Sequence, residues 1–470
     1  MKLIYGIKDK PKFGQLIVFA IQQLLAIMAA TLVVPVIING NITNFIADGT
    51  VTWTAGTMMS PAAALLGAGV GTLVYQLFTK FRSPVFLGSS FAFLGSMAAA
   101  FAGAVSMAAG YVGLIVGAVL AGLVYVIIAI IVKFAGVAWI NKLMPAVVIG
   151  PTVTIIGLSL AGNAVGDLQN APAGGDSKIA IICGLVTLAV TMICSTYGKK
   201  MIKLIPFIMG ILAGYAVAAI FTVIGNVAGI DALKVINFAP ITALWSEGVQ
   251  LSTFVSVPDF SFIQAFKGVK EIDGAYIASL AAAYMPVAFV VFAEHIADHK
   301  NISSIIESDL LEDPGLSRTL LGDGVGSMAG AFFGGCPNTT YGESVGCVAI
   351  TRNASVVPIT TAALGAILIA FLSPFVAFVN SIPSCVMGGV CMALYGFIAV
   401  SGLKMIQKVD LEANRNLFVV SVILIAGIGG LALTFGKVTI TNVAVALILG
   451  ILTNLMLNKA PKTEQNETEE

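Results

Sequence analysis

A carboxylate within a Gly/Pro-interrupted segment is the residue with the clearest chemical potential. The stretch 336–352 reads CPNTTYGESVGCVAITR and places Glu343 just before an apolar run. Lipid cannot satisfy free backbone amides and carbonyls, so a broken backbone at membrane depth occurs only where protein covers it or it lines a cavity. An ionisable side chain at that depth costs about 2.5–3.5 kcal/mol on insertion scales. The segment therefore predicts a transport site, although a structural helix cap would also explain Glu343.

A second polar cluster lies in the stretch 292–300, which reads FAEHIADHK and contains the only two histidines of the chain. Helical spacing places Glu294 one turn from Asp298, and His295 one turn from His299, on adjoining faces. One interpretation is a helix end that reaches water. The order Glu-His-x-x-Asp-His differs from the His-Glu-x-x-His motif of zinc proteases, so we predict no metal.

Asp323 is a third candidate, because it lies between two glycines in an apolar segment. A helix start near the membrane surface would also account for it. If Glu294 and Glu343 share one cavity, they would accept hydrogen bonds from N–H groups and repel anions. Aromatic rings could stack on a planar ligand, and the candidates are Phe91, Phe93 and Tyr341. Together these residues predict a site for a flat, neutral heterocycle that carries N–H groups.

The composition sets the environment in which these residues must lie. Of 470 residues, 58% are hydrophobic and 10% are charged, against about 25% charged in a soluble domain. The run from Ser83 to Val132 carries no charge at all, and it is long enough for two spans at about 20 residues each. The net charge of +1 gives no reason to expect a nucleic-acid partner. The six cysteines show no metal-ligand spacing, and no cofactor is predicted.

Apolar runs bounded by Gly, Pro or charges predict about fourteen membrane segments, two of them (near 85–107 and 337–351) short or interrupted. They fall near 13–38, 54–79, 92–107, 110–133, 143–162, 178–196, 203–229, 276–305, 319–335, 343–351, 354–379, 383–402, 415–433 and 438–458. A polar loop is expected at 231–273. The loops rich in Lys and Arg fall on one side under this count, so the positive-inside rule predicts that both termini are cytoplasmic.

An internal repeat is visible in two places. The motif GAGVGTL at 67–73 matches GDGVGSM at 322–328, where Ala68 replaces Asp323, and NKLMPAVVIG at 141–150 resembles NSIPSCVMG at 380–388. Seven segments per half is an odd number, so the two halves must be inverted. Interrupted segments in corresponding positions then mark the binding site. The counterpart of the Glu343 region is 88–93, with the sequence GSSFAF.

Nearly the whole chain resembles the nucleobase/ascorbate transporters, also called nucleobase/cation symporters, and is most similar to the bacterial uracil permeases. The motifs that carry this resemblance are AEHI at 293–296, DLLEDPGL at 309–316, PNTTYGE at 337–343 and AITR at 349–352.

The resemblance implies an all-α membrane protein of fourteen segments in two inverted repeats of seven. Segments 3 and 10 would begin as short antiparallel strands, at Val85–Gly88 and Asn338–Tyr341. A core domain (segments 1–4 and 8–11) would move against a gate domain (segments 5–7 and 12–14). The expected boundaries are 1–140 core, 141–231 gate, 232–273 extracellular loop, 274–379 core, 380–458 gate and 459–470 cytoplasmic tail.

By the same resemblance, two carboxylates would bind the polar edge of a pyrimidine, an aromatic ring would pack on it, and three residues would line the pocket. The two carboxylates are Glu294 and Glu343, and the aromatic ring is Phe91. The residues that line the pocket are Ser90, Tyr341 and Gly342. The resemblance also places Glu294 deep in the membrane, whereas the segment count puts it near a helix end. Proton coupling is expected at Glu294, Asp298, His295, His299 and Asp323.

Some positions depart from the family pattern. The common Gln-His of segment 1 is Gln22-Gln23, the Asn that usually follows the motif carboxylate is Ser344, and a His of uracil members is replaced by Asp298. Purine members tend to carry Gln where Glu343 stands, which favours a pyrimidine.

The sequence thus predicts proton-coupled uptake of uracil, or of a related nucleobase, across a bacterial inner membrane by a homodimer that contacts through the gate domain. A purine symporter of the same family is the nearest alternative. An anion exchanger of the same architecture is disfavoured, because two carboxylates at the site would repel anions. The sequence also lacks a complete enzyme motif and the repeated filter sequence of a channel.

Overall fold

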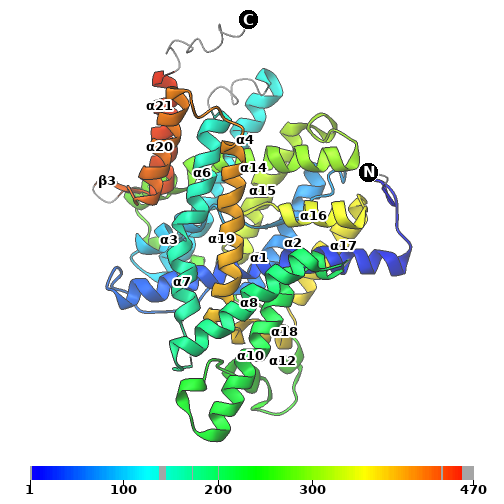
Figure 1. Ribbon diagram of the computed structural model, residues 1–470, viewed down its shortest axis with the longest axis vertical. Coiled ribbons are helices and arrows are strands. Elements are labelled where there is room, and N and C mark those ends of the chain that lie inside the picture. Colours follow the sequence, from blue (N-terminus) through cyan, green and yellow to red (C-terminus); the bar gives the residue numbers. More distant parts are fainter. Residues whose placement is uncertain (1–2, 137–143, 172, 200, 436–437, 458–470) are drawn as a thin grey trace, which may run out of the picture.

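The computed structural model describes residues 3–136, 144–171, 173–199, 201–435 and 438–457, and these residues are mostly helical (Figure 1). The predicted tail at 459–470 and the start of the repeat match at 141–143 lie outside these ranges. Eight helical stretches in the described ranges are long and apolar enough to cross a membrane. They are α1 (Phe13–Ala47), α2 (Pro61–Phe78), α4 (Met107–Ala135), α6 with α7 (Ala146–Ser159 and Ala161–Gln169), α8 (Ser177–Tyr197), α10 (Pro206–Ala228), α14 (Gly274–Ile306) and α19 (Ser384–Ile406).

The prediction of a mostly helical protein with many membrane spans is confirmed, while the count of fourteen segments stays a prediction. Three shorter apolar helices in the described ranges are α17 (Val356–Ile369), α20 (Asn414–Ile428) and α21 (Asn442–Met456). Local sequence explains where several helices begin. Ser60 caps α2 by accepting from the Ala63 amide, and Ser106 caps α4 by accepting from the Ala109 amide.

Two short strands interrupt the helical chain next to the polar motifs. Strand β1 (Leu87–Ser89) pairs antiparallel with β2 (Asn338–Thr340), with Gly88 opposite Thr339. Each strand leads into a short helix, α3 (Leu94–Ala102) after β1 and α16 (Gly342–Thr351) after β2. The strands expected from the resemblance overlap these, with β1 starting two residues later than expected. Backbone groups of two interrupted segments thus satisfy each other away from lipid.

The two helices that carry the matched glycine motifs pack directly against each other. These are α2 and α15 (Leu316–Gly334). A Cβ atom on Gly67 would lie 2.5 Å from the carbonyl oxygen of Gly330, and one on Gly71 would lie 2.7 Å from that of Gly326. Any side chain at these positions would push the helices apart, so the glycines permit the close crossing. Gly335, at φ +74°, then turns the chain from α15 toward β2.

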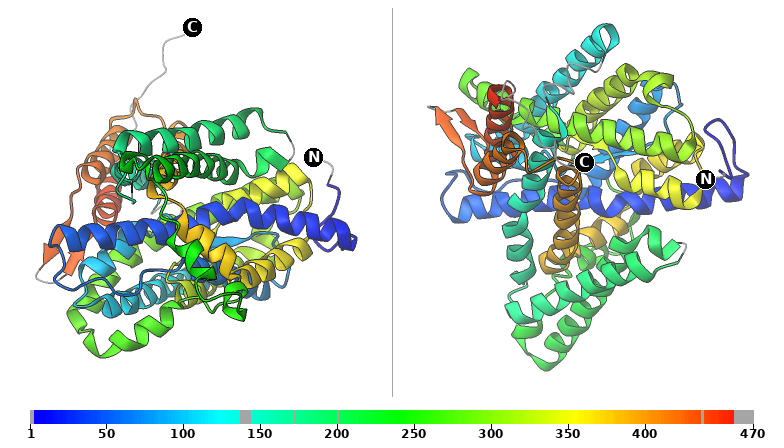
Figure 2. Two further views of the ribbon diagram at one scale, coloured as in Figure 1. Left: turned by 90° about the horizontal axis from the view of Figure 1, so that it is seen from below. Right: turned by 45° about the horizontal axis from the view of Figure 1, so that its top comes forward.

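The remaining long helices form a second group. Helix α6 runs beside α19 (Figure 1), and α8 packs on both α10 and α19. In the right-hand view of Figure 2, α8 and α10 extend away from the helices around α15. Helices α20 and α21 pack on each other and on α6. The structure therefore brings the helices of 146–228 together with those of 384–456, although these stretches are far apart in the sequence.

Several expected segments are divided differently. The expected run 354–379 is two helices, because the chain turns before Pro374 and α18 (Ser373–Ser381) starts there. The expected loop 231–273 contains short helices, of which α13 packs on α4. The remaining elements are α9 (Met201–Leu204), η1 (Asp231–Leu233), α11 (Ala239–Thr242), η2 (Ala243–Trp245), α12 (Leu251–Phe254), α13 (Ser261–Gly268), η3 (Val269–Glu271), η4 (Leu311–Gly315), β3 (Leu433–Phe435) and β4 (Val438–Ile440).

Candidate functional site

A cavity of about 440 Å³ lies between the two groups of helices. Its size falls in the range of small-molecule sites, about 300–1,000 Å³. One wall comes from the strands, α14 and α16, and the other comes from α6, α10 and α19. The first wall consists of Ser90, Phe91, Ala92, Glu294, Ala297, Asp298, Thr339, Thr340, Tyr341, Gly342 and Glu343, and the second of Val153, Ile156, Phe207, Leu394, Phe397, Ile398, Ser401 and Met405.

The first wall is polar because two chain breaks meet there. Glu343 occupies the first turn of α16, where free backbone amides and the positive end of the helix dipole are available. A Cβ atom on Gly342 would lie 3.8 Å from Asp298 Oδ1, so the start of α16 faces α14. The hydroxyl of Tyr341 donates to the Ser89 carbonyl at 2.6 Å, which fixes its ring beside β1.

Glu294 and Asp298 reach the cavity from α14, one helical turn apart. The Thr340 hydroxyl donates to Asp298 Oδ2 at 2.9 Å and ties β2 to α14. Twelve residues follow Glu294 before α14 ends at Ile306, and His295 and His299 are fully buried. The stretch 292–300 therefore does not lie at a helix end that reaches water.

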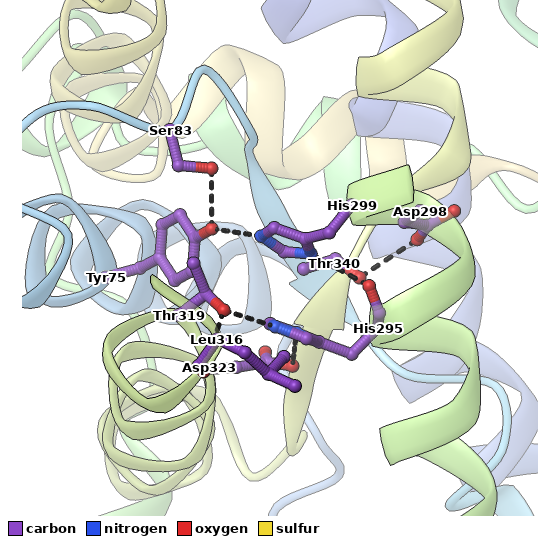
Figure 3. Close-up of polar contacts among 9 residues, drawn as sticks. All are labelled: Tyr75, Ser83, His295, Asp298, His299, Leu316, Thr319, Asp323 and Thr340. Atoms are coloured by element: carbon purple, nitrogen blue, oxygen red, sulfur yellow. Dashed lines mark hydrogen bonds and ion pairs between the residues drawn. The ribbon is translucent and has the colours of Figure 1, made fainter. Parts of the chain in front are cut away.

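Behind the cavity, the two histidines join a buried polar network that Figure 3 shows. His295 Nδ1 lies 2.8 Å from Asp323 Oδ2, and His295 Nε2 lies 3.0 Å from the hydroxyl of Thr319. His299 Nδ1 donates to the His295 carbonyl at 2.8 Å, because a carbonyl can only accept. His299 Nε2 lies 2.7 Å from the Tyr75 hydroxyl. The network connects α14 to α15 and α2.

The hydroxyl of Thr319 gives this network two satisfied arrangements. It lies 3.0 Å from His295 Nε2 and 3.0 Å from the Leu316 carbonyl, so its proton can point to either. When it points to His295, the Nδ1–H of a neutral imidazole donates to a charged Asp323. When it points to Leu316, the Thr319 oxygen can only accept from His295, so Nε2 carries a proton. The hydrogen bond between Nδ1 and Asp323 Oδ2 still needs a proton of its own, so the His295–Asp323 pair then holds one proton more than in the first arrangement. The pair therefore stays hydrogen-bonded with or without that proton.

All six residues predicted to bind substrate line the cavity: Ser90, Phe91, Glu294, Tyr341, Gly342 and Glu343. Of the five residues predicted for proton coupling, Glu294 and Asp298 also line it. His295, His299 and Asp323 lie outside its lining, in the network behind it. Phe93 is also outside, because its ring stacks on Tyr284 with the centroids 5.7 Å apart. The ring of Phe91 lines the cavity and meets Tyr395 of α19 edge-on, with centroids 6.3 Å apart.

Sequence reasoning missed the apolar wall and part of the polar one. The faces of α6 and α19 that line the cavity look like ordinary buried helix surface, so nothing in their sequence marks them. Thr339 and Thr340 were detectable, because they precede Glu343 in the same interrupted segment. Tyr75 carries no sequence signal, since its partner His299 is 224 residues away. Among the described residues, no group of three or more His, Cys, Asp or Glu side chains is placed to hold a metal ion.

Comparison with known proteins identifies the relatives of this chain. A family model described as "Permease family" matches residues 14–435. The chain is 39% identical to a uracil permease of Bacillus caldolyticus, over 100% of this chain and 98% of the relative. It is 36% identical to a uracil permease of Bacillus subtilis, with the same coverage. A uracil permease of Escherichia coli is 34% identical, over 95% of this chain and 92% of the relative.

Solved structures with a similar fold are more distant in sequence. The transmembrane domain of the cyanobacterial bicarbonate transporter BicA matches with a TM-score of 0.55 at 14% identity, over 96% of this chain and all of that one. The murine anion transporter Slc26a9, in an inward-facing state, matches with a TM-score of 0.62 at 11% identity, over 96% of this chain and 69% of that one. At these identities the likeness concerns the fold alone.

Proposed function

This chain belongs to the permease family and is a multi-pass membrane transporter of nucleobases rather than an enzyme, and we propose that its substrate is uracil, imported with a proton by alternating access. The observation that carries this proposal is the single cavity in which Glu294, Glu343 and Phe91 meet between two groups of helices.

The chemistry of the polar wall fits a pyrimidine. Uracil is flat and neutral, and it offers two N–H donors and two carbonyl acceptors. Glu294 and Glu343 supply acceptors for the N–H groups, and the free amides at the start of α16 supply donors for a carbonyl. Phe91 supplies an aromatic surface for the ring. Ser90, Tyr341 and Gly342 complete this side of the pocket.

Proton coupling is the second part of the proposal. Glu294 touches the cavity, and its neighbour His295 belongs to the pair that stays hydrogen-bonded with or without an extra proton. A proton taken up with the substrate would remove the charge of a carboxylate within the membrane, where a charged side chain costs about 2.5–3.5 kcal/mol. Asp298 connects this region to β2 through Thr340. We assign Glu294 as the proton-linked group and His295, His299, Asp298 and Asp323 as its supporting network.

Alternating access is supported by the position of the cavity. Its lining includes Phe207 at the start of α10 and Met405 near the end of α19, next to Lys203 and Lys404. By the positive-inside rule these helix ends are cytoplasmic, so the cavity reaches toward the cytoplasm in this structure. In this proposal residues 1–140 and 274–379 form the core domain and 141–231 and 380–458 the gate domain of a homodimer in the bacterial inner membrane, with both termini cytoplasmic.

Two other substrates follow from the comparisons and from the family. The two structural neighbours are a bicarbonate and an anion transporter, but the described lining of this cavity holds three carboxylates and no Lys or Arg. That charge pattern disfavours an anion. Xanthine carries the N–H and carbonyl pattern of uracil on its six-membered ring and adds an imidazole ring, so competition between the two bases has to be measured.

The test is uptake of labelled uracil, and in parallel of labelled xanthine, into proteoliposomes, with unlabelled uracil, xanthine, thymine, cytosine and sulfate as competitors. We expect uracil to compete fully and sulfate not at all. We expect a protonophore to abolish accumulation, and Glu294→Gln to do the same. The substrate assignment fails if xanthine is taken up and uracil is not. The coupling assignment fails if uracil accumulation survives both the protonophore and Glu294→Gln.

A further inference from the structure

A second, much smaller cavity lies within the group of helices that carries the strands. Its volume is about 10 Å³, and it lies between α4, α14, α15 and β2. Its wall combines apolar groups with a few polar side chains. The lining residues are Phe93, Ala121, Gly122, Tyr125, Val291, Asp323, Gly324, Ser327 and Asn338.

Three buried polar atoms of this wall have no hydrogen-bond partner within the described protein. They are the hydroxyl of Tyr125, Oδ1 of Asp323 and Oδ1 of Asn338. Their residues are at most 4% exposed. Buried polar groups in proteins are almost always paired, because a group taken from water without a partner destabilises the fold. Three such atoms around one cavity point to a ligand that satisfies them together.

The other polar atoms of two of these residues are already engaged, which fixes what each free atom can do. Asn338 Nδ2 donates to the Gly67 carbonyl at 3.0 Å, so its Oδ1 must accept. Asp323 Oδ2 lies 2.8 Å from His295 Nδ1, which leaves Oδ1 as an acceptor. The Tyr125 hydroxyl can donate. The cavity therefore presents two acceptors and one donor.

We propose that a single water molecule binds in this cavity, donates to Asp323 and Asn338, and accepts from Tyr125. One water supplies two donors and two acceptor lone pairs, so it can satisfy all three atoms, and buried waters typically make about three hydrogen bonds. The cavity is close to the volume of about 10–15 Å³ that one water needs. A cation would be bound by oxygen lone pairs alone and would leave the Tyr125 proton unused.

This water would connect the His295–Asp323 pair to strand β2. Asn338 begins β2, and the next residues of that strand, Thr339 and Thr340, line the substrate cavity. The buried carboxylate and the substrate-binding strand would then keep one fixed relative position. This inference does not depend on which nucleobase is carried.

Tyr125→Phe tests the proposal, with Tyr284→Phe as a matched control. Tyr284 is also fully buried with an unpartnered hydroxyl, but it lies outside the lining of the small cavity. Removing a hydroxyl that bonds to water should destabilise the protein, whereas removing an unpaired one should not. We expect the apparent Tm in detergent to fall by about 1–4 °C for Tyr125→Phe and to stay equal or rise for Tyr284→Phe. Equal shifts in the two variants would overturn the proposal.

A direct observation keeps the proposal testable if the variants express poorly. In a high-resolution structure of the unmodified protein, we expect one density peak in this cavity at about 2.7–3.0 Å from all three oxygen atoms. The same peak and the same Tm are expected in sodium, potassium and choline salts. A cavity without density overturns the proposal, as does a Tm that rises with sodium in the unmodified protein and not in Tyr125→Phe.

Discussion

Glu343 is the residue on which the choice of nucleobase depends most directly. It lies in the first turn of α16 and lines the cavity, where a carboxylate accepts hydrogen bonds but cannot donate. Glu343→Gln replaces one acceptor oxygen with an NH₂ donor and removes the negative charge, so an N–H of uracil loses its hydrogen bond to a charged acceptor. A hydrogen bond to a charged group contributes about 1.5–3 kcal/mol, so we expect the KM for uracil to rise by about 10- to 100-fold.

Uptake kinetics measure this change in KM, with the exposed Glu312→Gln as control. An unchanged KM in Glu343→Gln would remove Glu343 from the binding site.

Thr319 carries the second residue-scale prediction, because its hydroxyl can satisfy His295 in both protonation arrangements. Thr319→Val keeps the shape and removes the hydroxyl. We expect proton-driven accumulation of uracil to fall by about tenfold, since His295 Nε2 then loses a hydrogen bond of about 1–1.5 kcal/mol in both arrangements, and the arrangement with the extra proton leaves a buried N–H without an acceptor. Exchange of uracil for uracil, which needs no net proton movement, should fall much less.

Thr187→Val is the matched control, because Thr187 is also buried and its hydroxyl donates only to the Cys183 carbonyl of its own helix. Equal losses in accumulation and exchange would contradict this assignment.

At the scale of elements, the sequence predicted the interrupted segments better than their neighbours. Gly and Pro next to Glu343 marked the break before α16, because such residues end helices locally. Pro374 is a local signal for the start of α18 that the segment count did not use, whereas the packing of α13 on α4 depends on contacts between distant parts of the chain. Helical spacing correctly placed His295 one turn from His299, and the structure stacks their rings with centroids 3.9 Å apart. The partners Tyr75 and Asp323 come from other helices, so no local pattern could supply them.

Helices α1 and α7 make a contact that should open during transport. Asn163 Nδ2 donates to Asn41 Oδ1 at 3.2 Å, and a Cβ atom on Gly40 would lie 3.9 Å from Asp167 Oδ1. Asn41 lies near the end of α1, and by the predicted topology this is the extracellular end, opposite the side toward which the cavity reaches. If α1 belongs to the core and α7 to the gate, this contact closes the outer side and must break in the outward-open state.

Crosslinking tests this contact. In a variant with Asn41→Cys and Asn163→Cys, we expect a short bifunctional thiol reagent to reduce uracil uptake at least tenfold, because the linked helices cannot separate. Each single variant should keep its uptake under the same treatment. The pair Ser106→Cys and Glu271→Cys is a further control, because these hydrogen-bonded residues both belong to the part of the chain around α4. Undiminished uptake after complete crosslinking of Asn41→Cys/Asn163→Cys would show that α1 and α7 do not separate.

At the scale of the whole molecule, the proposed proton coupling sets a limit on uracil accumulation that can be measured. One charge moved through 100 mV supplies about 2.3 kcal/mol. At about 1.4 kcal/mol per tenfold ratio, one proton per uracil supports roughly 50-fold accumulation at that voltage without a pH gradient. Two protons would support roughly 2,000-fold.

Proteoliposomes held at a potassium diffusion potential of about 100 mV measure this limit as the plateau ratio of labelled uracil, inside over outside. We expect a plateau near 50-fold that is the same in sodium and in choline, and a ratio near one for Glu294→Gln, which cannot lose a proton. A plateau that needs sodium would reassign the coupling ion. A ratio well above 50-fold would require a second proton, and the His295–Asp323 pair is then its expected carrier, because that pair stays hydrogen-bonded with and without one.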